Sequence, residues 1–125
     1  MKKFLASLLA AGLLASVVTV SAAEKESPAP KTVIHVVTVS WKEGTKPEQI
    51  QAALDGVKAM PAKYPGLTRV WTNSFKVQGD KTHAFVMEFK DRAAFTAYTD
   101  SPAQLEWYKT YLPIRGESTT FDITN

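Results

Sequence analysis

The sequence predicts an α+β domain in which a four-stranded antiparallel sheet carries helices on one face. Three observations support this prediction. Residues 33–41 and 83–89 alternate in the two-residue period of β-strands. Residues 50–57 instead repeat apolar side chains at the spacing of a helix. Turn-forming residues separate these segments, so the order of elements is strand, helix, strand, strand, helix, strand.

The first strand is expected at Val33–Trp41, and both of its faces begin with apolar side chains. One face carries Val33, His35, Val37, Val39 and Trp41, and the other carries Ile34, Val36, Thr38 and Ser40. Apolar residues on both faces indicate a central strand that is covered from both sides.

The first helix is expected to begin near Thr45. Thr45 and Glu48 have the spacing of a capping box, and Pro47 falls in the first turn, where its missing N–H is not needed. Pro61 and the Tyr64-Pro65-Gly66 turn are expected to stop this helix. Its apolar face is formed by Ile50, Ala53, Leu54 and Val57.

Two strands joined by a loop are expected next. The second strand is placed at Leu67–Phe75, and a loop containing Gly79-Asp80 reverses the chain direction. The third strand is placed at His83–Phe89. One of its faces carries His83, Phe85, Met87 and Phe89.

The remaining segment contains two helix starts and a strand. Asp91 can cap a helix that runs to about Thr99, and Ser101-Pro102 can start a second helical segment that ends at Leu112. A short last strand is expected at Thr119–Ile123.

Because crossover connections are right-handed, this order has one compact arrangement, the ferredoxin-like β-α-β-β-α-β fold with its helices on one face of the sheet. The other face would then expose an apolar patch larger than soluble monomers usually tolerate. We therefore expect a homodimer in which two sheets pack face to face. The patch consists of Ile34, Val36, Ala84, Val86, Phe121 and Ile123.

The first 23 residues have the layout of a secretory signal peptide. Lys2-Lys3 precede an apolar run at 4–20, and Ser21-Ala22-Ala23 supplies small residues for cleavage. The run is short for a membrane span, which needs about 20 residues, so we expect cleavage rather than an anchor. We expect export, and favour the periplasm over the cell exterior because the signal is short and no wall-anchoring tail follows.

A polar tether at residues 24–31 and a single domain at residues 32–125 are expected to follow the signal peptide. Without Lys2 and Lys3, thirteen basic residues face twelve acidic ones, a net charge of +1. This balance and the lack of a basic cluster argue against nucleic acid as a partner. The chain has no cysteine, which excludes a lipoprotein anchor, disulfides and zinc–thiolate sites. No membrane contact is expected after cleavage.

Several motifs, in this order and spacing, resemble the stress-responsive A/B barrel domain family. They are residues 33–37, 42–45, 65–67 and 83–89, Tyr98 with 101–103, and 121–123. The resemblance covers roughly residues 32–124 and implies a dimeric α+β barrel with a cavity between sheet and helices. It implies no single activity, because members include proteins known only as stress-induced and a plant polyketide cyclase.

Cyclase-like members use a tyrosine and a histidine in a segment that resembles residues 98–104. The tyrosine corresponds to Tyr98. The His-Pro-x-His pattern of many relatives stands here as Ser101-Pro102-Ala103-Gln104, so Gln104 occupies the place of the general base. An amide cannot take up a proton near neutral pH, whereas imidazole can. This departure argues against cyclase activity.

His35 and His83 match positions where relatives carry histidine. With Asp122 on the flanking strand, they could form a cluster that orients a polar group of a ligand, and Tyr98 could donate a hydrogen bond from above. Alternatively, these polar groups satisfy one another or nearby backbone. No metal site is expected because the short-range spacing of known metal ligands is missing, and no cofactor is expected.

Two functions from different classes follow. We expect a binding module without catalysis that holds a small, mostly apolar molecule on the helix side of the sheet. The cavity would be lined by Val37, Val39, Phe85 and Met87, with His35, His83, Tyr98, Gln104 and Asp122 as polar groups. The alternative is a cofactor-free enzyme, such as a monooxygenase, isomerase or cyclase, in which Tyr98 and His83 act on an aromatic or polyketide-like substrate. A purely structural role in the cell envelope is a third reading.

Overall fold

The computed structural model describes residues 31–125. In chain order its elements are β1 (Val33–Trp41), α1 (Pro47–Lys63), β2 (Leu67–Trp71), β3 (His83–Phe89), α2 (Arg92–Tyr98), α3 (Pro102–Tyr111) and β4 (Arg115–Ile123). The expected signal peptide at residues 1–23 and nearly all of the expected tether lie outside the described residues. Within the described residues, no helix has the length and apolar character to cross a membrane.

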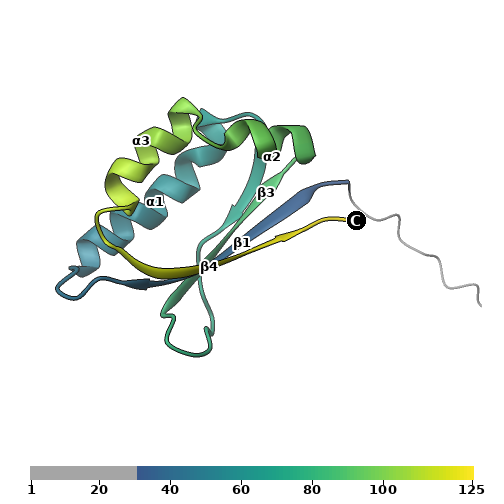
Figure 1. Ribbon diagram of the computed structural model, residues 1–125. Helices are drawn as coiled ribbons and strands as arrows, with labels where there is room; N and C mark the ends of the chain where they lie inside the picture. Colours follow the sequence, from purple (N-terminus) through teal and green to yellow (C-terminus); the bar gives the residue numbers. More distant parts are fainter. Residues whose placement is uncertain (1–30) are drawn as a thin grey trace, which may run out of the picture.

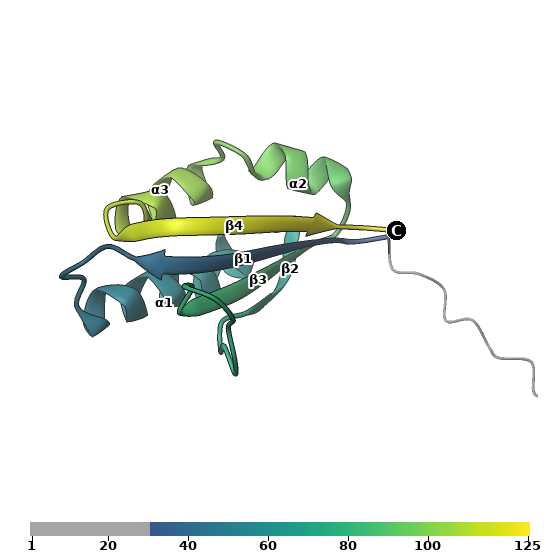
Figure 2. The same cartoon turned by 60° about the horizontal axis from the view of Figure 1, so that its bottom comes forward.

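The four strands form one antiparallel sheet in the order β2-β3-β1-β4, which confirms the ferredoxin-like fold. All three helices lie on one face of this sheet (Figures 1 and 2). β1 is central, and its Val37 stands opposite Phe85 of β3 and Thr120 of β4. The helix side of the sheet is its inner face, and the opposite side is its outer face.

The first helix differs from the expectation at its start, but it ends directly before the Tyr64-Pro65-Gly66 turn, as expected. It begins at Pro47, after Lys46, whose backbone N–H donates to Oε1 of Gln49 at 2.9 Å. The Thr45 hydroxyl does not cap the helix, because it donates to the Lys42 carbonyl at 2.7 Å. Pro61 does not stop the helix, which continues to Lys63. Pro61 removes one backbone hydrogen bond of the last turn, and the helix ends two residues later, at Lys63.

β2 is shorter than expected and β4 is longer. β2 ends at Trp71 because Ser74 binds the backbone of Ala84 with its hydroxyl, at 2.7 Å to the N–H and 2.9 Å to the carbonyl, in place of strand pairing. β4 starts at Arg115, which pairs with Trp41, and a register shift separates this pair from the rest of the strand.

The predicted caps of the two later helices are confirmed, since Asp91 accepts the Ala94 N–H at 2.7 Å and Ser101 accepts the Gln104 N–H at 3.3 Å.

Trp107 joins α3 to α1 in the core. Its indole N–H donates to the Ala53 carbonyl at 2.9 Å, and its ring stacks on Tyr111 with centroids 4.4 Å apart. The close approach depends on Gly56, because a Cβ at that position would lie 2.5 Å from the Trp107 ring. Helices α1 and α3 are thereby held close together on the inner face. The fully buried side chains of the core are Val39, Val57, Met60, Leu67, Phe85, Met87 and Phe89.

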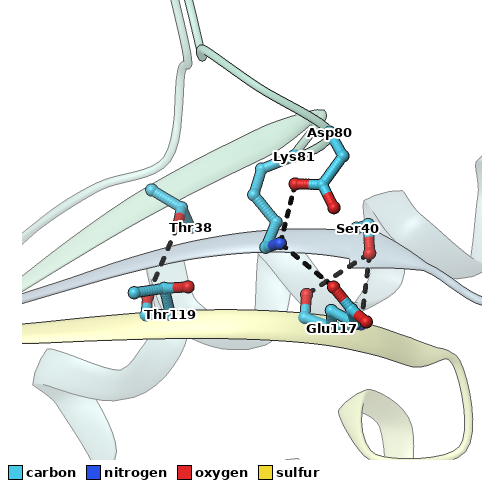
Figure 3. Close-up of polar contacts among 6 residues, drawn as sticks. All are labelled: Thr38, Ser40, Asp80, Lys81, Glu117 and Thr119. Atoms are coloured by element: carbon cyan, nitrogen blue, oxygen red, sulfur yellow. Dashed lines mark hydrogen bonds and ion pairs between the residues drawn. The ribbon is translucent and has the colours of Figure 1, made fainter.

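The outer face is apolar at one end and polar at the other. Large apolar side chains remain exposed on it: Trp71 at 47%, Phe121 at 54% and Ile123 at 58%. At the polar end, Lys81 binds Asp80 at 2.9 Å and Glu117 at 3.5 Å, and Ser40 accepts the Glu117 N–H at 3.1 Å (Figure 3). This network and a separate hydrogen bond from the Thr38 hydroxyl to the Thr119 carbonyl cover the part of the face where β1 has no apolar residue.

Candidate functional site

A cavity of about 240 Å³ lies between the inner face of the sheet and helices α2 and α3. Its walls are largely apolar and aromatic: Val37, Phe85, Met87, Phe95, Trp107 and Tyr111. Its polar groups are His35, Tyr98, Gln104, Tyr108, Arg115 and three small hydroxyl residues, Thr99, Ser118 and Thr120. Arg115, Ser118 and Thr120 of β4 are exposed to solvent, so the cavity opens along this edge strand.

His35 and Asp122 form a hydrogen-bonded pair beside this cavity. They stand opposite each other on β1 and β4, and the His35 Nδ1–H donates to Asp122 Oδ1 at 2.6 Å. The rings of Phe89 and Phe95 flank the imidazole, at centroid distances of 6.4 and 5.7 Å. A carboxylate on Nδ1 fixes both the orientation and the tautomer of the ring. Nε2 is therefore left to exchange a proton or a hydrogen bond with another group.

Tyr98 reaches the cavity from the end of α2. Only 4% of the residue is exposed, and its ring packs against Tyr64 and Phe89. Its hydroxyl has no hydrogen-bond partner among the described residues. Burial raises the pKa of Tyr98 well above its usual value, so the hydroxyl stays protonated and can serve as a donor. A buried hydroxyl without a partner costs about 1–3 kcal/mol.

Gln104 lines the cavity but is already used by the fold. Its side-chain Oε1 accepts the backbone N–H of Asp100 at 2.8 Å. Asp100 has a left-handed backbone conformation with φ of 61°, and this bond holds the sharp connection between α2 and α3. The amide thus has a positioning role in the loop that carries Tyr98 and Thr99 toward the cavity.

His83 does not join His35 and Asp122. The strand register places His35 opposite Met87 and His83 opposite Val39, so four residues, about 13 Å along the strand, separate the two imidazoles. His83 instead accepts a hydrogen bond from Trp41 Nε1 at 2.9 Å. The expected Asp-His-His cluster is therefore not formed. Val39 is also absent from the lining, because it is fully buried beneath the helices.

No group of three or more metal-ligating side chains of the His, Cys, Asp and Glu types occurs in residues 31–125. His35 and Asp122 alone supply two donors, and they are bound to each other. Protein metal sites usually require three or four converging ligands.

Arg115 and Tyr108 were not predicted as site residues. Arg115 lies in a segment that was expected to be a loop, because the last strand was placed four residues too late. Its guanidinium carbon lies 5.8 Å from the centroid of the Tyr111 ring. Burial raises the pKa of Tyr111 to about 12 and also raises the pKa of Tyr108, while the nearby Arg115 opposes both shifts. The aromatic residues at 107, 108 and 111 make a ligand platform conceivable, but core packing and dimer contacts are commoner uses of such residues.

The unpartnered hydroxyl of Tyr98 predicts an unusual stability effect. Tyr98→Phe should raise the free energy of unfolding by about 1 kcal/mol, because it removes a buried polar group that has no partner. Tyr64→Phe is the matched control. It should lower stability by about 1 kcal/mol, since the Tyr64 hydroxyl donates to the Ala94 carbonyl at 2.7 Å. Urea denaturation of both variants measures the difference, and equal losses would contradict the assignment.

Comparison with known proteins supports a family assignment. The sequence profile of the stress-responsive A/B barrel domain matches residues 33–125. No curated protein shows significant sequence similarity to the chain. Among solved structures, a hydroxynitrile lyase from Passiflora edulis is similar, with 20% identity, a TM-score of 0.68, and coverage of 77% of this chain and 94% of that one.

Two further structures have the same fold. A Dabb family protein from Mesorhizobium loti is 22% identical, with a TM-score of 0.63 and coverage of 75% of this chain and 96% of that chain. A dimeric ferredoxin-like protein of unknown function from Thermobifida fusca is 16% identical, with a TM-score of 0.63 and coverage of 75% and 91%. Likeness at these identities establishes the fold alone. Together with the profile match over most of its length, it shows that the chain belongs to the stress-responsive A/B barrel domain family.

Proposed function

We propose that this protein is an exported homodimer that binds a small, largely apolar molecule in the cavity beneath α2 and α3. The observation that carries this proposal is the cavity itself, whose lining is mostly apolar and includes Tyr98, Gln104 and Arg115 among its polar residues. Apolar walls with a few placed polar groups are the usual composition of a small-molecule site.

Export and dimerisation rest on different observations. The charged start, apolar run and small-residue site of residues 1–23 support export and favour the periplasm. The exposed apolar end of the outer face supports a two-fold contact between sheets. The similar protein from Thermobifida fusca is described as dimeric.

The binding site predicts the effect of blocking the cavity. Thr120 lines it from β4 opposite Val37, so Thr120→Trp should fill the opening. The neutral dye N-phenyl-1-naphthylamine, which fluoresces in apolar surroundings, should bind the wild-type protein and lose at least roughly tenfold in affinity in this variant. Thr110→Trp, on the exposed surface of α3, is the control and should bind the dye as the wild type does. Equal binding by all three proteins would refute the cavity as the site.

The dimer predicts a change in sedimentation. Phe121→Lys places a charge in the exposed apolar end of the outer face and should convert a micromolar dimer into a folded monomer, because an unpaired charge buried in an interface is strongly unfavourable. Thr110→Lys, on the helix side, should remain dimeric. A well-folded wild-type monomer at micromolar concentration would contradict the proposed assembly.

A cofactor-free enzyme is the second candidate, and the His35–Asp122 pair is the observation that favours it. An imidazole that is oriented by a carboxylate and lines a cavity can act in general acid–base catalysis. The similar protein from Passiflora edulis is a hydroxynitrile lyase. For the binding protein proposed above, we expect neither the wild type nor Gln104→His to release benzaldehyde from mandelonitrile. If either protein releases benzaldehyde, and adding His35→Gln to that protein abolishes the release, the result would favour the enzyme instead.

A further inference from the structure

We infer that the molecule held in this cavity carries an anionic group, such as a carboxylate, which binds to Arg115 at the cavity opening. This inference rests on the proposed binding function and specifies the class of ligand. It would make the ligand an amphipathic organic acid with one aromatic or branched apolar end.

The described lining of the cavity carries charge of one sign, and the neighbouring Asp122 carboxylate is already hydrogen-bonded to His35. No Asp or Glu belongs to its described lining, whereas Arg115 does. Among residues 31–125, no carboxylate lies within 4.0 Å of Arg115. The other arginine of the sheet, Arg69, is paired with Glu88 on the outer face. Arg115 is permanently charged at any physiological pH, so the opening of the cavity presents a positive charge that the described residues leave unneutralised.

The position of the guanidinium is defined by its neighbours. Arg115 begins β4 opposite Trp41, and the adjacent Ile114 carbonyl accepts the Lys42 N–H at 2.9 Å, which fixes the backbone at this point. The side chain lies over the Tyr111 ring. A guanidinium that lies over an aromatic face still has N–H groups to donate, and this planar fork matches the two oxygens of a carboxylate.

The apolar walls of the cavity suit the other end of such an acid. Arg115 stands at the start of β4, while Tyr98 lies at the end of α2, against Phe89 and Tyr64. The apolar walls formed by Val37, Phe85 and Met87 belong to the same cavity. A ligand with its carboxylate at the opening would place its apolar end against these walls. Steering by the exposed charge would also increase the rate of encounter with anions.

The test compares 3-phenylpropanoate with 3-phenylpropanamide, which have the same shape and differ in charge. In calorimetric titrations of the exported protein, we expect the acid to bind roughly tenfold more tightly than the amide. Arg115→Gln should abolish this preference, and Arg115→Lys should retain part of it. Lys76→Gln, which removes the same charge from the exposed loop after β2, should leave the preference unchanged. Thr120→Trp should weaken binding of the acid.

Equal binding of acid and amide to the wild type, or a preference that survives in Arg115→Gln, would overturn the inference. Failure of both probes to bind a protein that still binds N-phenyl-1-naphthylamine in the cavity would also overturn it and leave the proposed function standing. Failure of the dye as well would refute the proposed function itself. The thermal unfolding temperature of Arg115→Gln shows whether that variant is folded. Arg115→Lys allows the same comparison of acid and amide binding in a variant that keeps the positive charge.

Discussion

The register of β1 against its two neighbours is the constraint on which the rest of the structure depends. Antiparallel pairing places Val37 between Phe85 and Thr120, and these three residues form the floor of the cavity. The same pairing sets His35 beside Asp122 and keeps it away from His83. A shift of one residue would turn every side chain of the strand to the other face of the sheet, so the cavity and the His35–Asp122 pair would be lost together.

The sequence was sufficient to predict the fold because its strongest signals agree with one another. The period-two pattern gave the bounds of β1 and β3, and the caps at Asp91 and Ser101 located α2 and α3. The errors fall where long-range contacts decide the local structure. Ser74 ends β2 by binding Ala84, and pairing with Trp41 extends β4 back to Arg115, which no local pattern at residues 115–118 indicates.

The candidate site was harder to predict for the same reason. The sequence allowed Asp122 to point to the same face as His35 and left open whether such polar groups bind a ligand or satisfy one another; the structure shows that His35 and Asp122 are hydrogen-bonded. The separation of His83 depends on the exact register, which the sequence leaves undetermined. The use of the Gln104 amide to hold Asp100 depends on the geometry of a tight loop. Arg115 could not be recognised before the edge of the cavity was known to lie at the start of β4.

The alternation along β1 has a mechanical consequence for a dimer formed through the outer face. Val37 lies under the cavity, and its chain neighbour Val36 belongs to the opposite surface, opposite Val86 and Phe121. Only one peptide unit of β1 thus separates the ligand cavity on the inner face from the proposed dimer interface on the outer face. A closely packed strand transmits displacement instead of absorbing it. Ligand binding would then change the equilibrium constant of dimerisation, and dimerisation would change that of ligand binding by the same factor.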